Sequence, residues 1–379
     1  MNKVRTLAIA LMALSLFACK KQEPKQTEDA VLSLRIDDAE LRAIESQIGN
    51  GTTTTITENV KVILNGGAGR TYTLTPAQIT AAKTQSDGCK FNVTDVVTSV
   101  TLIANAEVTD DTSITAWQGK AADFQTKIPL TATTTNITST TSSDGKITYK
   151  AELTPVPPFA RLEVFGKITP VKNETNQKCA FESIEVKEVY INNYLDTRNA
   201  TKRYFTGHNA SLNGFETATT TTSSPLKTQM YDEIKTTDKG AFEAGTKAAA
   251  YQLFPKKTDE KANVSDHVIL KLAIKYSADA IAKGFPKDEQ IRYVTIKKFK
   301  PDAKPVGRPQ PNHPVLKFNV GTIYKLDLKG LNDHFKTNED GTPDPNNPDS
   351  SEPESKGKKE LQLIVKPCTW TSQNILPEL

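Results

Sequence analysis

Motifs for catalysis and for metal binding are missing from this 379-residue chain. No GxSxG elbow, Walker loop, GxGxxG loop or HExxH pair occurs, and the glycine cluster at 66–69 is typical of a hairpin. The four histidines are too widely spaced to form a ligand pair or an acid–base pair: His208, His267, His313 and His334. The segment 338–344 superficially resembles a calcium loop, but it lacks the ligand spacing and the terminal Glu of an EF-hand. We therefore expect a protein that is not an enzyme and that holds no metal or other cofactor.

The chain also lacks an excess of either charge. Lys and Arg total 48 against 44 Asp and Glu, so the net charge is only +4, and the charges are scattered along the chain. A nucleic-acid partner would call for a clustered basic region, so we expect none. The apolar content of 37% is nevertheless sufficient for two ordinary domains with buried cores.

Cysteine is scarce, and none of the four cysteines forms a CxxC pair. One of them, Cys19, belongs to the leader described below. The other three leave an odd number in an exported protein: Cys89, Cys179 and Cys368. One disulfide among them and three free thiols are both compatible with the sequence.

A long hydrophobic run occurs at the N-terminus, where the basic residues of 1–5 precede the apolar segment Thr6–Phe17. This segment has the length of a secretory signal and is too short to span a bilayer. It ends in Leu16-Phe-Ala-Cys19, which resembles the lipobox of bacterial lipoproteins, whose cysteine thiol accepts a diacylglyceryl group before cleavage. A plain signal peptide with an incidental cysteine is the alternative. We expect a signal peptide over residues 1–18 and a lipid anchor on Cys19.

Strand patterns dominate the rest of the chain. In Ala30–Ile36, the apolar residues recur at every second position, which is typical of a strand with one buried face. Thr and Val are enriched and long helical periodicity is absent, which favours an all-β sandwich over an α/β fold. Thr75 as a cap and Pro76 at the first position predict one short helix over Pro76–Lys83. Further strands are expected within 59–64, 100–104, 146–153, 160–168, 181–192, 249–254, 267–276, 292–298 and 322–328.

Three prolines between Thr154 and Pro158 suggest a domain boundary, because proline interrupts a strand ladder. We therefore expect two β-sandwiches in series, over residues 43–156 and 157–335, without a sequence repeat clear enough to prove duplication. Residues 19–42 form a propeptide on this interpretation, and 336–379 form a linker and a final strand.

The C-terminal region combines a polar segment with a strand pattern. Residues 337–355 are rich in Pro, Asn and Asp and hold almost no apolar residues, which predicts an extended, solvated tether. In the following segment, Leu361, Leu363 and Val365 alternate onto one face. A single strand is not stable alone, because its backbone groups and its apolar face both need a sheet.

Taken together, these features resemble the fimbrillin family, the subunits of type V surface fimbriae of Bacteroidetes-type bacteria. The resemblance covers essentially the whole chain and rests on the following segments in this order: 16–19, 59–64, 159–164, 323–328 and 363–370. It implies an all-β subunit with two transthyretin-like β-sandwich domains and a tethered C-terminal donor strand. It also implies a precursor that reaches the outer membrane as a lipoprotein.

The resemblance further implies that an arginine-specific protease removes the lipid anchor together with the first strand. On this chain the removable strand is Ala30–Ile36, and the cut falls between Arg42 and Ala43. The rival site, Arg35–Ile36, lies inside the strand and is poorly accessible. The groove left behind is costly in water, and the C-terminal strand of a neighbour can refill it, with Leu361, Leu363 and Val365 facing inward.

Each subunit would then offer one strand and one groove, a head-to-tail contact that builds a filament. We expect a stalk subunit of a cell-surface fimbria that contributes to adhesion and biofilm, with other copies and related fimbrial subunits as partners. One alternative is a monomeric outer-membrane surface lipoprotein that binds glycans. Another is an accessory, tip or anchor component, although a complete first strand and a complete donor strand favour the stalk.

Overall fold

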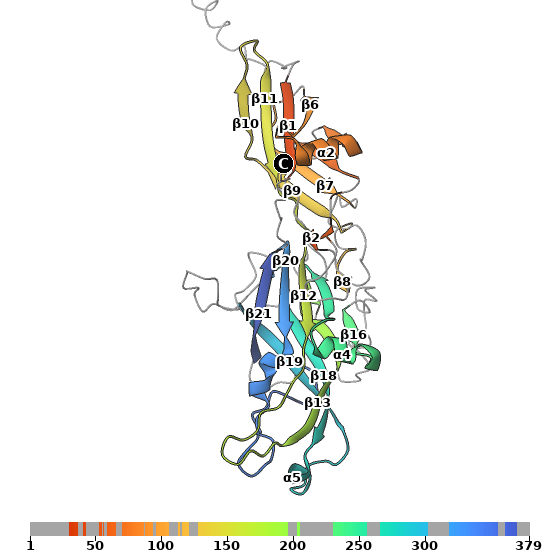
Figure 1. The fold of residues 1–379 in the computed structure, drawn as a ribbon, viewed down its shortest axis with the longest axis vertical. Helices are drawn as coiled ribbons and strands as arrows, with labels where there is room; N and C mark the ends of the chain where they lie inside the picture. Colours follow the sequence, from red (N-terminus) through yellow and green to blue (C-terminus); the bar gives the residue numbers. More distant parts are fainter. Residues whose placement is uncertain are drawn as a thin grey trace, which may run out of the picture.

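The computed structural model describes residues 30–36, 41–42, 53–54, 56, 59–65, 70–86, 88–93, 96–105, 113, 116–120, 128–195, 203–204, 230–255, 266–301, 318–354 and 361–369. Two β-rich halves follow one another along the long axis of the molecule (Figure 1). The predicted signal peptide, Cys19 and Ala43 lie outside the described residues. Among the residues that are described, no helix is long and apolar enough to cross a membrane.

The N-terminal half consists of two four-stranded sheets around one core. The first sheet has the order β10 (Thr138–Thr141), β11 (Ile147–Leu153), β1 (Ala30–Ile36) and β6 (Cys89–Val93). The second has the order β5 (Thr71–Thr73), β4 (Lys61–Leu64), β7 (Val100–Ala104) and β9 (Leu130–Thr134). Apolar residues from both sheets, among them Leu32, Val62 and Leu102, are buried in this common core.

Helix α2 (Pro76–Thr84) connects β5 to β6, which confirms the helix expected from the sequence. The Thr75 hydroxyl accepts a hydrogen bond from the Gln78 amide, and the Gln78 side chain accepts one from the Thr75 amide, so the two residues form a capping box. Ile79 and Ala82 are buried and belong to the core of the N-terminal half. The sequence predicts this helix because a capping residue and a proline at the first position act on the adjacent backbone.

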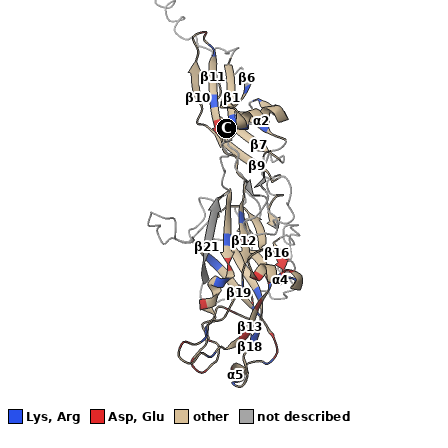
Figure 2. Ribbon diagram, in the orientation of Figure 1, with Lys and Arg blue, Asp and Glu red and all other residues tan. Residues whose placement is uncertain are grey.

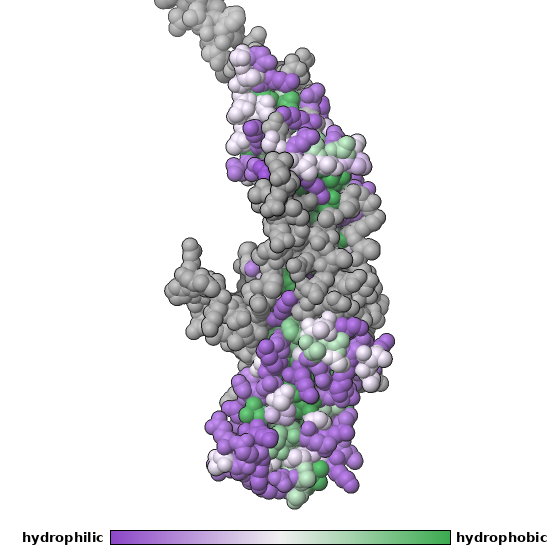
Figure 3. All heavy atoms as spheres, in the orientation of Figure 1, coloured by the Kyte–Doolittle hydropathy of each residue, from purple (hydrophilic) through white to green (hydrophobic). Residues whose placement is uncertain are grey.

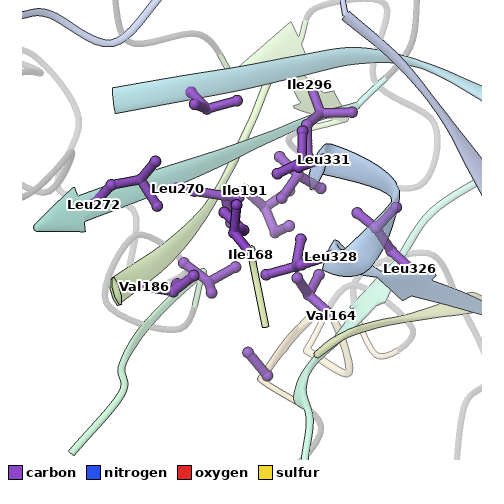
Figure 4. Close-up of a cluster of buried hydrophobic side chains, with 14 of the residues drawn as sticks. Val164, Ile168, Val186, Ile191, Leu270, Leu272, Ile296, Leu326, Leu328 and Leu331 are labelled. Atoms are coloured by element: carbon purple, nitrogen blue, oxygen red, sulfur yellow. The ribbon is translucent and has the colours of Figure 1, made fainter. Parts of the chain in front are cut away.

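In the described chain, nine strands form one continuous ladder in the C-terminal half. Their order is β16 (Tyr231–Glu233), β13 (Phe181–Asn192), β18 (His267–Tyr276), β19 (Gln290–Pro301), β21 (Leu361–Thr369), β20 (Thr322–Asp327), β12 (Ala160–Phe165), β17 (Ala249–Leu253) and β8 (Gly119–Lys120). One of them, β8, comes from the segment between β7 and β9. The ladder folds around a second core, in which Val164, Leu270 and Leu328 are fully buried (Figure 4). The all-β fold class expected from the sequence is confirmed.

Short elements complete the described chain. They are the helices α4 (Thr236–Glu243) and α5 (Ala278–Ile281), the 3-10 helix η2 (Leu328–His334), and two two-stranded sheets, β2 (Leu41–Arg42) with β3 (Thr53–Thr54) and β14 (Tyr194–Leu195) with β15 (Arg203–Tyr204).

The two halves repeat one topology. In the N-terminal half, β1 lies between the last strand, β11, to which it is parallel, and β6, to which it is antiparallel. In the C-terminal half, β12 lies in the same way between the parallel β20 and the antiparallel β17. The order β10-β11-β1-β6 corresponds to β21-β20-β12-β17, and β5-β4-β7-β9 corresponds to β16-β13-β18-β19. The topology thus reveals a repeat that the amino-acid sequence does not.

The polar segment 337–354 folds against the C-terminal half, so the expectation of an extended, solvated tether is wrong for these residues. Several of its polar residues are buried: Thr337, Asn347, Asp349, Ser350 and Glu354. The expectation counted only apolar burial, whereas hydrogen bonds order this segment. The Lys336 amide donates to Asn347 Oδ1 over 2.8 Å, and Asn347 Nδ2 donates back to the Lys336 carbonyl over 3.0 Å. The abundant Asn and Asp residues therefore serve as turn and bridge formers.

The described surface is mixed in charge and largely hydrophilic. Lys, Arg, Asp and Glu are interspersed over both halves (Figure 2). Hydrophilic side chains cover most of the visible described surface, with only small apolar areas between them (Figure 3). Among the described residues, the exposed large hydrophobic ones are Val96, Val171, Ile291 and Val320, which lie far apart in the sequence.

Gly88 lets β1 approach the chain between α2 and β6. Its φ is +65°, and a Cβ added there would lie 2.7 Å from the carbonyl carbon of Leu34 and closer still to its oxygen. Both the backbone conformation and the space therefore require glycine at this position. Gly145 also has a positive φ, +84°, but nothing lies within 4 Å of the place that a Cβ would take.

These two glycines give a matched test of how tightly β1 is seated. We expect Gly88→Ala to lower the free energy of unfolding by about 2 kcal/mol or more, because backbone strain adds to a clash with Leu34. Gly145→Ala should cost about 1 kcal/mol, from strain alone. Urea denaturation of both variants measures the difference, and equal losses would show that β1 is not seated as described.

Candidate functional site

Strand β1 is the central element of the site, because it holds the first sheet of the N-terminal half together. Ala30, Leu32, Leu34 and Ile36 are 0–1% exposed. Complete burial of a Leu or Ile side chain contributes about 1.5–3 kcal/mol, so Leu32, Leu34 and Ile36 stabilise the half considerably. The sequence predicted both the strand and its buried face.

Within the part of the chain that the structure describes, β1 is the only strand that pairs with β6. Its antiparallel ladder with β6 runs from Ala30 opposite Val93 to Leu34 opposite Cys89. On its other side, the parallel ladder with β11 runs from Val31 to Ile36. Removing β1 would therefore leave a groove between β6 and β11 with unpaired backbone groups on both walls.

β1 and β12, the first strands of the two halves, occupy equivalent positions but differ in how deeply they are buried. Alternate residues on the outer face of β12 are Arg161 and Glu163, whose side chains are 2% and 3% exposed and form an ion pair with 2.7 Å between Arg161 Nε and Glu163 Oε1. Burial lowers the pKa of Arg161 to about 10, although the neighbouring Glu163 partly offsets this effect. On the outer face of β1, by contrast, the Arg35 side chain is half exposed. β12 is thus enclosed on both faces, whereas β1 has a face that reaches solvent.

The predicted cleavage residues lie at different kinds of position. The Arg35–Ile36 bond lies inside β1, with Arg35 opposite Glu152 of β11, so a protease cannot reach it while the sheet is intact. Arg42 belongs to the short strand β2, and its backbone pairs with Thr53 of β3. Cleavage after Arg42 and lipidation of Cys19 stay predictions, because Ala43 and Cys19 lie outside the described residues.

The C-terminal strand β21 occupies a central position in the sheet of its own C-terminal half. Its first part runs parallel to β19, with Leu361 opposite Ile296, Leu363 opposite Phe299 and Val365 opposite Pro301. Its last part runs antiparallel to β20, from Lys366 to Thr369. The predicted strand is therefore present, and in this state it has folded back onto its own chain.

The two described ladders of β21 share no residue, and Pro367 lies in the second one. Among the described residues, the ladder with β19 ends at Val365, and Pro367 pairs with Tyr324 of β20 alone. A proline has no amide hydrogen, so it is tolerated where one side of the strand has no partner. Cys368 follows opposite Ile323, and the pairing continues through Thr369.

Glu354, close in sequence to β21, is held by side chains from three strands. His267 Nδ1 of β18 lies 2.6 Å from Glu354 Oε1, and Asn192 Nδ2 of β13 donates to the same oxygen over 3.0 Å. Lys297 Nζ of β19 lies 3.3 Å from Glu354 Oε2, and the Glu354 amide donates to Thr295 Oγ1 of β19 over 3.0 Å. The Glu354 side chain is 1% exposed. We call Glu354 and these four partners the Glu354 clasp.

The clasp keeps its carboxyl group ionised. Burial of Glu354 raises its pKa, but the hydrogen bond and charge of His267, together with Asn192 and Lys297, outweigh burial, so the pKa lies below the usual glutamate value. Ionisation of Glu354 therefore stabilises the folded state. Its φ of 54° is unusual for a residue other than glycine, and the surrounding contacts must maintain it.

Two further contacts fasten the same segment just before the clasp. Asp349 Oδ2 accepts from Arg292 Nε over 2.8 Å. Ser350 and Tyr293 exchange two backbone hydrogen bonds of 2.8 and 2.9 Å. Residues 349–354 are thus joined to β19 between Arg292 and Lys297.

Other candidate chemistry is not assembled in the described part of the chain. No group of three His, Cys, Asp or Glu residues there could hold a metal ion. Cys89 and Cys179 are free thiols, and burial raises the pKa of Cys89, which disfavours its reactive thiolate. Asp340, in the segment that superficially resembles a calcium loop, accepts hydrogen bonds from the Thr342 amide and hydroxyl.

Sequence reasoning identified both strands but missed the Glu354 clasp. Glu354 lies 162 residues from Asn192 and 87 from His267, so no local spacing connects them. Within Ser-Glu-Pro-Glu-Ser it resembles any solvated carboxylate, and in the sequence His267 is simply the first residue of a strand pattern. The positive φ and the burial of Glu354 become visible only in three dimensions.

The clasp predicts a specific pH dependence. Because folding lowers the pKa of Glu354, its stabilising effect is complete above the usual glutamate value of 4.5 and is lost as the pH falls through the lower folded value. Glu354→Gln should therefore lower the free energy of unfolding by about 1–3 kcal/mol at pH 7, and this deficit should shrink well below pH 4.5. Urea midpoints at pH 7 and pH 3 measure this change.

Glu339→Gln is the matched control for this experiment, because Glu339 is an exposed carboxylate in the same segment. It should behave like the unmodified chain at both pH values. A Glu354→Gln deficit that is the same at pH 7 and pH 3 would contradict the assignment of an ionised clasp.

The comparisons with known proteins concern overall shape. No protein-family model matches this chain, and no curated protein matches its sequence. A fimbrilin (fimA) from Porphyromonas gingivalis W83 is similar over 92% of this chain and 99% of its own, with 13% identity and a TM-score of 0.45. The tip fimbrial protein Mfa3 from Porphyromonas gingivalis, with C-terminal truncation, is similar over 79% and 93%, with 10% identity and a TM-score of 0.31. For a fimbrial assembly protein from Parabacteroides distasonis the shares are 79% and 89%, with 12% identity and a TM-score of 0.28.

Proposed function

We propose that this chain is a structural, non-enzymatic subunit of a surface fimbria. Its copies polymerise when strand β21 of one copy replaces strand β1 of the next, after a cut between Arg42 and Ala43 releases β1. On this proposal the chain is a stalk component that contributes to adhesion, and its precursor is an outer-membrane lipoprotein held through Cys19.

The observation that carries the proposal is the place of β21 in the repeat. After the last strand of the N-terminal half, Val156 exchanges two backbone hydrogen bonds of 2.9 and 3.0 Å with Thr131 of β9, and the chain then forms β12, the opening strand of the next half. After β20, which corresponds to β11, Ser350 pairs with Tyr293 of β19 in the same way, and the chain then forms β21. By its place after a completed half, β21 corresponds to an opening strand, and in its own half that position is already filled by β12.

The pairing pattern of β21 also suits the position of β1. Both strands pair with one parallel and one antiparallel neighbour, although on β1 the two ladders run side by side, whereas on β21 the parallel ladder precedes the antiparallel one. Apolar residues alternate along both, and the nine residues of β21 are enough to replace the seven of β1. A strand that leaves one sheet for another of the same pattern regains its backbone hydrogen bonds and its buried face.

The same geometry supports proteolysis as the switch. While β1 is in place, both walls of its position are paired and no second strand can enter. Once it is removed, β6 loses its described partner, and the exposed ladder groups favour immediate refilling. Because the groove belongs to one half and β21 follows the other, the contact is head to tail and does not close, which produces a filament.

Replacement of the arginine at the cut tests the switch without changing its charge. We expect Arg42→Lys to abolish filaments, because an arginine-specific protease does not cut after lysine, whereas Arg35→Lys should leave them normal. Electron microscopy of the cell surface and N-terminal sequencing of polymerised protein, which should begin at Ala43, provide the measurements. Normal filaments from Arg42→Lys would refute the proposed switch, and a monomer that retains an acylated Cys19 would favour the glycan-binding lipoprotein.

A disulfide can test whether β21 has to leave its own sheet. Ile323 of β20 lies directly opposite Cys368 of β21, and opposite residues of antiparallel strands are about 4.5–5.5 Å apart, within the range of a disulfide. We expect Ile323→Cys to block assembly when oxidised and to permit it when reduced. The control is the same substitution combined with Cys368→Ser, which should assemble under both conditions. Equal assembly of the oxidised and reduced Ile323→Cys protein would show that β21 is not the exchanged strand.

A further inference from the structure

The Glu354 clasp and the start of β21 meet β19 at neighbouring residues. The Glu354 amide bonds to Thr295, while Leu361 pairs with Ile296, the next residue of the same strand. Six residues, 355–360, separate Glu354 from Leu361 in the sequence. The chain therefore uses six residues to connect two points that are one strand residue apart.

This excess length corresponds to a considerable reach. The seven Cα–Cα steps from Glu354 to Leu361 can span up to about 25 Å when extended, at about 3.3–3.6 Å per residue. A free tether over all of 337–360 would instead span up to about 80 Å. Where the chain is fixed thus decides how far β21 can move.

The contacts of β21 could be replaced by those of another subunit, whereas the contacts of Glu354 could not. The ladders of β21 consist of backbone pairs, which any strand position with the same neighbours can offer. The Glu354 carboxylate depends on His267, Asn192 and Lys297, which lie on three strands of its own half. If Glu354 left this site, its carboxylate would lose these partners, and His267 and Lys297 would lose their carboxylate. Releasing β21 from its sheet therefore costs less free energy than releasing Glu354.

We propose that Glu354 is the positioning residue from which β21 swings into the next subunit. Residues 337–354 stay on their own half during assembly, and only 355–360 set the reach of the exchanged strand. This inference rests on the proposed function. It confines the acceptor groove to within about 25 Å of the clasp and thereby requires closely packed subunits.

The test shortens the segment 355–360 in the full-length precursor, which is then cut with an arginine-specific protease to start assembly. Deletion of 356–358 leaves three residues between Glu354 and Leu361, which still bridge neighbouring residues of β19. The melting temperature of the uncut protein should therefore not change. The rate of filament formation should fall about tenfold or more, because a linker that cannot span two sites loses its effective concentration. A full-length chain with Lys356→Ser and Lys358→Ser controls for the lost charges and should assemble normally.

A second variant, in which the Glu354 clasp is released, separates the two possible roles of Glu354. Combining the deletion with Glu354→Ala moves the last fixed point back to Ser350, lengthens the free segment and should restore assembly at least in part. If Glu354 only stabilised the fold, the double variant would instead form filaments more slowly than the deletion alone. Full assembly of the shortened chain, or no rescue in the double variant, would overturn the inference.

Hydrogen exchange on unmodified filaments gives an independent measurement that does not depend on how the variants fold. The amides of Ser350 and Glu354, which donate to Tyr293 and Thr295, should be as protected in filaments as in the monomer. Loss of their protection on assembly would also overturn the inference. If the unmodified chain and the serine control form no filaments after the cut, the proposed function fails and not the role of Glu354.

Discussion

The backbone pairing of β1 is the constraint on which the N-terminal half depends. A central strand must satisfy donors and acceptors on both of its edges, and β1 does so for β6 and β11 at once. Without it, the four-stranded sheet would separate into the pair β10–β11 and a solitary β6. Anything that takes its place must be extended, must alternate apolar residues and must pass closely over Gly88. The N-terminal half is therefore complete only when a strand of this kind is present, whichever chain supplies it.

Because the topology repeats, the C-terminal half has the same requirement for a central strand, and β12 meets it. β12 fulfils it permanently, because it is buried on both faces and carries the enclosed ion pair of Arg161 and Glu163. β1 fulfils it with one face closer to solvent, at the end of the described chain. Equivalent positions in one topology can thus hold a strand that is fixed and a strand that is suited to removal, and the difference lies in what covers the outer face.

Much of this architecture could be predicted from the sequence, because the signals are local. Alternation marks β1, β12 and β21, and the cap at Thr75 marks α2. The order of nine strands could not be predicted, since it depends on which distant edges meet, and neither could the return of β21 to its own half. The largest error concerned residues 337–354, where low apolar content was interpreted as a lack of order. Contacts such as Glu354 with Asn192 span 162 residues, beyond the reach of any periodicity.

The direction of the strands has a mechanical consequence. β1, β11 and β12 run roughly along the long axis of the molecule (Figure 1). In the filament proposed above, tension along the axis would act parallel to the strand that takes the place of β1. The hydrogen bonds on both of its edges would then be loaded together in shear, so that many must break at once, instead of opening one after another as a zipper does. A joint without any covalent bond between subunits could in this way withstand pulling far better than its modest number of contacts suggests.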